Sequence, residues 1–231
     1  MHTIYIEEGG YEEKAPVITD IHFTLQEGEM IGLIGGNGAG KSTTIQAMLG
    51  TLPYVKGKVT LPAFGYVPER PILYDYYTLA EHIHLLVQCS VQPETVQKRA
   101  YELALLFKLD AHFEEYPTTF SKGMQQKVML ILAFAPRYSF YIVDEPFMGL
   151  DPQAIRALIH LLAELRDEGA TILLSTHALD TAEKLCDRFL CLHNGGIIAQ
   201  GSLQALQRYP DEPLLDIFDR VIDEVTYVSI S

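Results

Sequence analysis

The chain has 231 residues, of which 48% are hydrophobic, and a formal net charge of −13 at pH 7. This length and composition suit one folded domain with a sizeable core and exclude a disordered chain. The negative charge disfavours a broad surface for nucleic acid, so no nucleic acid is expected as a partner. The three cysteines form no Cys-x-x-Cys pair, which predicts reduced thiols and neither disulfides nor a zinc site.

The first part of the chain alternates between strand patterns and turns. Strands are predicted at residues 3–7, 21–25, 30–34 and 64–68. The third of these is a continuous apolar run, which is typical of a strand buried on both faces. A helix is expected from Lys41 to about Leu49, because Gly50 can end it.

The middle of the chain has helical patterns. Thr78 and Glu81 form a capping box, which predicts a helix that starts at the next residue after Thr78. Helices are also expected to start at Pro93 and to run from Ser121 to Pro136. We expect a single domain over residues 1–231, with a catalytic α/β core of residues 1–71 and 138–208, a helical subdomain of residues 72–137 and a C-terminal extension of residues 209–231.

Strand patterns return in the last part of the chain. Strands are predicted at residues 138–143 and 170–175, and a hairpin at residues 189–200 that turns on Asn194-Gly195. A helix starting at Asp151-Pro152 is expected to bury a face made of Ile155, Leu158, Ile159, Leu162 and Leu165. A tail helix is expected to pack on the protein through Leu214, Leu215, Phe218, Val221 and Ile222.

One segment, Gly35-Gly36-Asn37-Gly38-Ala39-Gly40-Lys41-Ser42-Thr43, matches the phosphate-binding loop and lies between a buried strand and a helix. Its glycines allow a tight turn whose backbone N–H groups point at phosphate oxygens. The following helix adds the positive end of its dipole. Lys41 is expected to reach the β- and γ-phosphates, and the Ser42 hydroxyl to bind Mg2+.

Two acidic residues follow the predicted strand 138–143. A carboxylate at the end of a buried strand can complete the ligands of Mg2+, which is the role expected of Asp144. Glu145 is the expected general base that activates the attacking water. Together with the phosphate loop, these acids predict a magnesium-dependent nucleotide hydrolase.

Further segments make the chain resemble the ABC ATPase family over residues 1 to about 208. Residues 120–128, Phe-Ser-Lys-Gly-Met-Gln-Gln-Lys-Val, resemble its signature segment, which usually reads Leu-Ser-Gly-Gly-Gln and is followed by Gln-Gln-Arg-Val. Residues 65–69 resemble its Q-loop, residues 149–152 its D-loop and residues 175–177 its switch. Tyr11 matches the aromatic residue that stacks on adenine.

The resemblance implies roles for single residues. His177 would lie near the γ-phosphate, and Glu69 would help to bind Mg2+. Ser121, Gly123 and Asp151 would reach the ATP of a second ATPase subunit. The implied fold is α/β, a phosphate-loop NTPase core of the RecA-like type with an N-terminal antiparallel β portion and an inserted α-helical subdomain. Two such subunits, expected to be identical, would clamp two ATP molecules head to tail.

A narrower resemblance, carried by residues 68–74, 120–129 and 144–152, is to the Ecs-type ATPase subunits of Gram-positive bacteria. It implies a partner, an integral membrane permease subunit on a separate chain, and a place on the cytoplasmic face of the cell membrane. It also implies transport linked to peptide export or peptide processing. The sequence agrees with this division, because its apolar runs fall far short of the roughly 20 residues of a membrane helix and acidic residues interrupt its first stretch.

Some positions depart from the family or leave alternatives open. Glu69 replaces a glutamine, and Lys122 and Met124 replace a glycine and a glutamine of the signature. Lys122 either adds charge near the phosphates or points to solvent. Three tyrosines after the Q-loop stand where this family docks its membrane partner, or else form an ordinary exposed loop; they are Tyr74, Tyr76 and Tyr77.

The alternative function is a soluble ABC ATPase without a transporter, acting in translation, repair or assembly. The single domain argues against a translation factor, because those carry two such domains. The lack of coiled-coil or zinc insertions argues against a repair ATPase. A GTPase-like switch lacks its Asn-Lys-x-Asp segment here.

Overall fold

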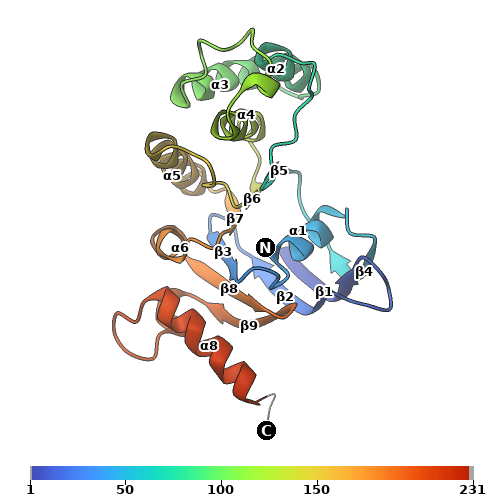
Figure 1. The fold of residues 1–231 in the computed structure, drawn as a ribbon, viewed down its shortest axis with the longest axis vertical. Helices are drawn as coiled ribbons and strands as arrows, with labels where there is room; N and C mark the ends of the chain where they lie inside the picture. The colour runs from blue at the N-terminus through green and yellow to red at the C-terminus, as the bar shows by residue number, and fades with distance from the viewer. Residues whose placement is uncertain (1, 229–231) are drawn as a thin grey trace. The chain divides into compact units, whose positions relative to one another are not determined.

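The computed structural model describes residues 2–228, which form two compact units (Figure 1). The first unit contains residues 2–62 and 166–228, and the second contains residues 63–165. The helical subdomain predicted over residues 72–137 falls inside the second unit, and its boundaries stay a prediction. No helix within residues 2–228 combines the length and the apolar character needed to cross a bilayer.

The strands of the first unit form two groups. The antiparallel group has the order β2 (Ile18–Leu25), β1 (His2–Gly10) and β4 (Tyr54–Val59). The other group has the order β7 (Thr171–Ser175), β3 (Met30–Gly35), β8 (Arg188–His193) and β9 (Gly196–Gly201), parallel except for β9. Every residue of β3 and β7 is buried, which explains why neither strand alternates between apolar and polar residues.

The helices of the first unit are α1 (Lys41–Leu49), α6 (Leu179–Leu185), α7 (Leu203–Leu206) and α8 (Leu214–Val228). The first of these contacts strands of both groups, and its end at Gly50 is confirmed because Gly50 has a left-handed φ of 70°. The last packs on α6 and β9 (Figure 1). The strand β4 and the helix α6 were not predicted, because β4 exposes two lysines and α6 has only seven residues.

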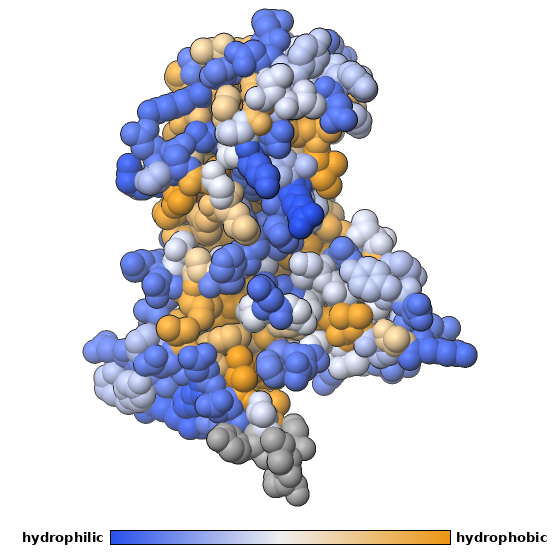
Figure 2. Space-filling model, in the orientation of Figure 1, coloured by the Kyte–Doolittle hydropathy of each residue, from blue (hydrophilic) through white to orange (hydrophobic). Residues whose placement is uncertain are grey.

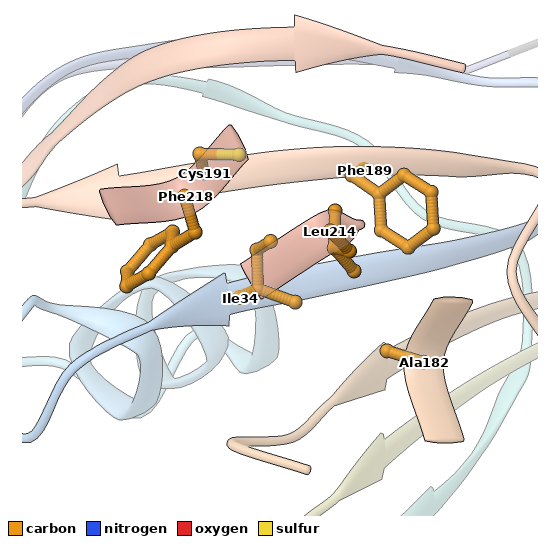
Figure 3. Close-up of a cluster of buried hydrophobic side chains, with 6 residues drawn as sticks. All are labelled: Ile34, Ala182, Phe189, Cys191, Leu214 and Phe218. Atoms are coloured by element: carbon orange, nitrogen blue, oxygen red, sulfur yellow. The ribbon is translucent and has the colours of Figure 1, made fainter. Parts of the chain in front are cut away.

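A buried cluster joins α8 to the strand that precedes the phosphate loop. Its side chains are Ile34, Ala182, Phe189, Cys191, Leu214 and Phe218 (Figure 3). The tail helix therefore packs on the protein as predicted, but its predicted face was wrong at Leu215. That side chain is 48% exposed, and Ile217 is buried instead, because the helix turns a slightly different stripe toward the sheet.

The second unit contains a parallel pair of strands and most of the helices. The strands are β5 (Phe64–Val67) and β6 (Phe140–Asp144), and the helices are α2 (Leu79–Gln88), α3 (Pro93–Leu106), the short η1 (Pro117–Thr119), α4 (Lys122–Phe134) and α5 (Pro152–Asp167). The capping box is confirmed, since Glu81 N–H donates to Thr78 Oγ1 over 3.2 Å and Thr78 N–H donates to Glu81 Oε2 over 2.7 Å.

The predicted inner face of α5 was wrong in part. Ile155 and Ile159 are only half-buried, while the buried residues are Ala154, Leu158, Leu161, Leu162 and Leu165. Both faces satisfy the helical period, and they share Leu158, Leu162 and Leu165. Periodicity alone therefore could not decide which residues at the edge of the stripe are covered.

Candidate active site

The glycine-rich loop connects β3 to α1 in the first unit. Gly38 and Gly40 have φ values of 77° and 108°, a left-handed conformation that disfavours other residues. A Cβ atom on Gly36 or Gly38 would meet no atom within 4 Å, so this part of the loop faces open space. A Cβ atom on Gly40 would lie 2.9 Å from Ile18 Cγ2. The backbone at Gly36 and Gly38 is therefore open to a ligand that approaches closely, whereas Gly40 packs against β2.

Positive charge and N–H donors gather at this loop. Lys41 Nζ donates to Gly35 O over 2.7 Å and to Gly36 O over 3.3 Å, which holds the ammonium over the loop. No side chain caps α1 at Gly40, so the N–H groups of its first turn remain available to a ligand. Ser42 is exposed and Thr43 is buried. This arrangement fits an anionic group such as phosphate.

The first unit also places Tyr11 and His177 near the ends of the elements that hold the loop. Leu33 pairs with Ser175 in the parallel ladder of β3 and β7, so the loop and His177 leave the sheet at the same edge. The Tyr11 hydroxyl donates to Gln46 Oε1 on α1 over 3.1 Å, and the Tyr11 side chain is 57% exposed. The turn that carries Tyr11 has mostly hydrophilic side chains of its own, and it lies at the right of the view in Figure 2.

The second unit brings three carboxylates to one edge of its strand pair. Val67 of β5 pairs with Val143 of β6 in the parallel ladder. Glu69 and Glu145 each come two residues after this pair, and Asp144 is the last residue of β6, so all three follow the strands at the same edge. Asp144 and Glu145 are buried, and Glu69 is exposed. Glu145 has a φ of 45°, a strained conformation that costs a non-glycine residue about 1–3 kcal/mol and that can mark an active site.

Tyr66 lies near the carboxylates of Asp144 and Glu69, and the sequence analysis assigned no role to it. Burial raises its pKa to about 12, with smaller contributions from the negative charges of Asp144 and Glu69. The phenol therefore stays neutral near pH 7 and can donate a hydrogen bond there. Its position inside the segment that resembles the Q-loop was the available signal.

A second group of predicted residues surrounds the N-terminus of α4. Ser121 caps this helix, since its Oγ accepts from Met124 N–H over 3.3 Å. Gly123 lies so close to the next segment that a Cβ there would be 2.3 Å from Gly149 O. Asp151 Oδ1 accepts from the N–H groups at the start of α5, those of Gln153 and Ala154, over 3.0 and 2.9 Å.

The tyrosines after β5 form an exposed aromatic group on a buried support. Tyr74 is 61% and Tyr76 is 89% exposed, and the rings of Tyr74 and Tyr77 are 5.2 Å apart. His82 is buried beneath them. Its Nε2 accepts from Tyr74 N–H over 2.9 Å, and its Nδ1–H donates to Thr78 O over 2.8 Å. The sequence offered no function for His82, and the structure shows that it holds this loop.

Each unit thus brings together its own share of the predicted residues. The first holds Tyr11, the loop of residues 35–43 and His177. The second holds Glu69, Asp144 and Glu145 at one edge, and Ser121, Gly123 and Asp151 around α4.

The chain is similar to known proteins over most of its length. Residues 18–148 match the family described as ABC transporter. The chain is 42% identical to the ABC transporter ATP-binding protein YthP of Bacillus subtilis, over 94% of each chain, and 43% identical to the ABC-type transporter ATP-binding protein EcsA of the same organism, over 86% of each. A solved structure of an ATP-binding subunit of an ABC transporter is 36% identical, with a TM-score of 0.89 over 96% of this chain and all of that one.

Proposed function

The chain belongs to the ABC transporter family as an ATP-binding ATPase subunit, and from this premise we propose that it powers a separate membrane subunit that exports or processes peptides. The observation that carries the proposal is the loop of residues 35–43, with its open glycines and with Lys41 held over its carbonyl groups. The peptide substrate class is taken from the resemblance to the Ecs-type subunits, and the 43% identity to EcsA supports that resemblance.

The proposal assigns the phosphate grip to the loop and to Lys41. During hydrolysis, water attacks the γ-phosphorus while the bond to the β–γ bridging oxygen breaks, and Glu145 takes the proton of that water. His177 positions the γ-phosphate. Most of the catalysis comes from positioning and from stabilisation of charge, because phosphoryl transfer needs little covalent chemistry from the protein.

Magnesium fits the chemistry of the residues that are present. The donors are the hydroxyl of Ser42 and the carboxylates of Asp144 and Glu69, and Mg2+ prefers oxygen ligands of this kind. When bound, the ion would neutralise charge on the β- and γ-phosphates. The carboxylate of Glu69 brings one more negative charge than the glutamine usual in the family.

The proposed working unit is a head-to-tail dimer on the cytoplasmic face of the membrane. Each ATP would be held by the loop of one subunit and by Ser121 and Gly123 of the other. ATP would favour the closed dimer and ADP the open one, and this difference in affinity would be the source of the drive. The alternative of a soluble ATPase without a transporter is not favoured by the relatives, which are transporter subunits by name.

The exposed tyrosines are the proposed contact with the membrane subunit. A loop held by the buried His82 offers aromatic side chains in a fixed arrangement, as hot spots of protein interfaces do. His82→Gln is expected to leave the ATPase activity of the isolated subunit unchanged and to reduce its stimulation by the membrane subunit. His84→Gln, at an exposed position on the same helix, is the matched control.

The test of the function is purification of the tagged chain from membranes together with whatever polytopic protein it binds. The complex, placed in vesicles, is expected to move labelled peptides in an ATP-dependent manner and to lose this with Lys41→Ala. Recovery of the chain without any membrane protein would contradict the transporter function. ATP turnover in the complex without movement of any peptide would contradict the peptide substrate class alone.

A further inference from the structure

Lys127 connects α4 to the residue that precedes α5. Its Nζ donates to Asp151 Oδ2 over 2.6 Å, and its side chain is only 12% exposed. The other oxygen of Asp151 caps α5. Both carboxylate oxygens of Asp151 are therefore engaged within their own unit, one by α4 and one by α5.

A second contact lies one helical turn away on α4. Gly123 and Lys127 are four residues apart, so they share the same helix face. Gly123 lies against Gly149 O, and Lys127 pairs with Asp151, so both contact the segment of residues 149–151. The helix that Ser121 caps and this segment are thus joined at two points.

We propose that Lys127 is a positioning residue, which through Asp151 fixes the segment of residues 149–151 to α4 and so sets the position in which Ser121 reaches the ATP of the opposite subunit. The inference rests on the head-to-tail dimer of the proposed function. Lys127 touches no reacting atom, and its effect passes through the block formed by α4 and this segment. A partly buried lysine is costly without a partner, and Asp151 is the partner that the structure gives it.

Two roles of the pair make different predictions. If the ion pair only stabilised the fold, its loss would lower the stability of the subunit and slow both ATP sites alike. A positioning role would slow turnover in one site only, the site that receives Ser121 from the altered subunit. Small displacements of positioning groups can cost up to about a hundredfold in rate.

The first experiment compares Lys127→Met, which removes the charge and keeps most of the stem, with Lys127→Arg, which can restore a single hydrogen bond to Asp151 Oδ2. In the intact dimer, Lys127→Met is expected to lower kcat by about tenfold to a hundredfold with ATP affinity nearly unchanged, because Lys41 and its loop are untouched. Lys127→Arg is expected to recover most of kcat. Lys98→Met is the control, since Lys98 is 81% exposed in the same unit.

The second experiment uses mixed dimers in which one subunit carries Lys41→Ala. The remaining active site takes its loop from the other subunit and its Ser121 from the Lys41→Ala subunit. Lys127→Met is expected to slow turnover when it is in the Lys41→Ala subunit and to have little effect when it is in the other one. Asp151→Asn, which removes the charge of the pair and can keep the cap of α5, replaces Lys127→Met if that variant does not fold, and it is expected to act from the same subunit.

Equal loss of turnover in both positions, or no loss in either, would overturn the positioning role. Ser121→Arg in the same two positions tests the dimer itself. It is expected to silence the active site only from the Lys41→Ala subunit. If Ser121→Arg acts from the other subunit instead, the head-to-tail dimer is wrong and the role of Lys127 falls with it.

Discussion

A Cβ atom on Gly123 would lie 2.3 Å from the carbonyl oxygen of Gly149, closer than real Cβ atoms come to any neighbour. The glycine of the signature segment is therefore required by packing within its own subunit, in addition to any contact that it makes with ATP. Gly149 itself has a φ of 75°, so the segment that approaches Gly123 also depends on glycine.

We predict that Gly123→Ala will destabilise the protein by about 1–3 kcal/mol, because the backbone at Gly149 must move away from the new methyl group. Urea denaturation measures this free energy of unfolding. Gly196→Ala is the matched control, since a Cβ there meets its nearest atoms at ordinary distances of 3.8 and 3.9 Å. Equal effects of the two substitutions would show that the contact with Gly149 can relax at no cost.

Glu145→Gln is predicted to reduce ATP turnover by about a hundredfold or more, because the amide cannot accept the proton of the attacking water. The substitution keeps the size of a side chain whose backbone has the strained φ of 45°. ATP is still bound, so the variant is expected to accumulate as a dimer in the presence of ATP. Size-exclusion chromatography and a phosphate-release assay check both parts, and normal turnover would remove Glu145 from the role of base.

The ion pair of Asp151 predicts an acid dependence of stability. The hydrogen bond from Lys127, followed by that from Ala154 N–H, lowers the pKa of Asp151 from 3.8 to about 2. A lowered folded-state pKa gives stability that is present above about pH 4 and is lost as the pH falls toward 2.

Asp151→Asn can still cap α5, so it removes the charge and keeps the cap. Its denaturation midpoint is predicted to lie below that of the unaltered protein at pH 6, with the difference shrinking as the pH approaches 2. Asp151 is half exposed, so salt should reduce the difference as well. A difference that stays constant from pH 6 to pH 2 would show that the charge contributes nothing.

Phe218→Ala is predicted to cost about 3 kcal/mol of unfolding free energy, because it opens a cavity in the buried cluster that contains Ile34 (Figure 3). Leu215→Ala, on the same helix, is the control and should cost well under 1 kcal/mol, because its side chain is 48% exposed. Thermal or urea denaturation measures both. Equal costs would mean that α8 contributes little through this face.

Much of the fold was predictable because its signals are local. The left-handed turn at Asn194-Gly195, the capping box at Thr78 and the cap at Ser121 each follow from residues within a few positions of one another. The helical faces were less certain. At α5 and α8 the apolar stripe is wider than the face that is covered, so Ile155, Ile159 and Leu215 satisfy the period and are still only partly buried or exposed.

The sequence by itself determined the phosphate loop, the buried acidic strand end and the family, because these depend on residue types at fixed short spacings. Only the tertiary structure decided which side chains contact and position these segments. Lys127 and Asp151 are 24 residues apart, and their pairing depends on how α4 packs against the segment before α5. Tyr66 and His82 gain their roles in the same way, from groups that the folded backbone brings to them. Such contacts depend on packing between elements, which a linear pattern of residues does not encode.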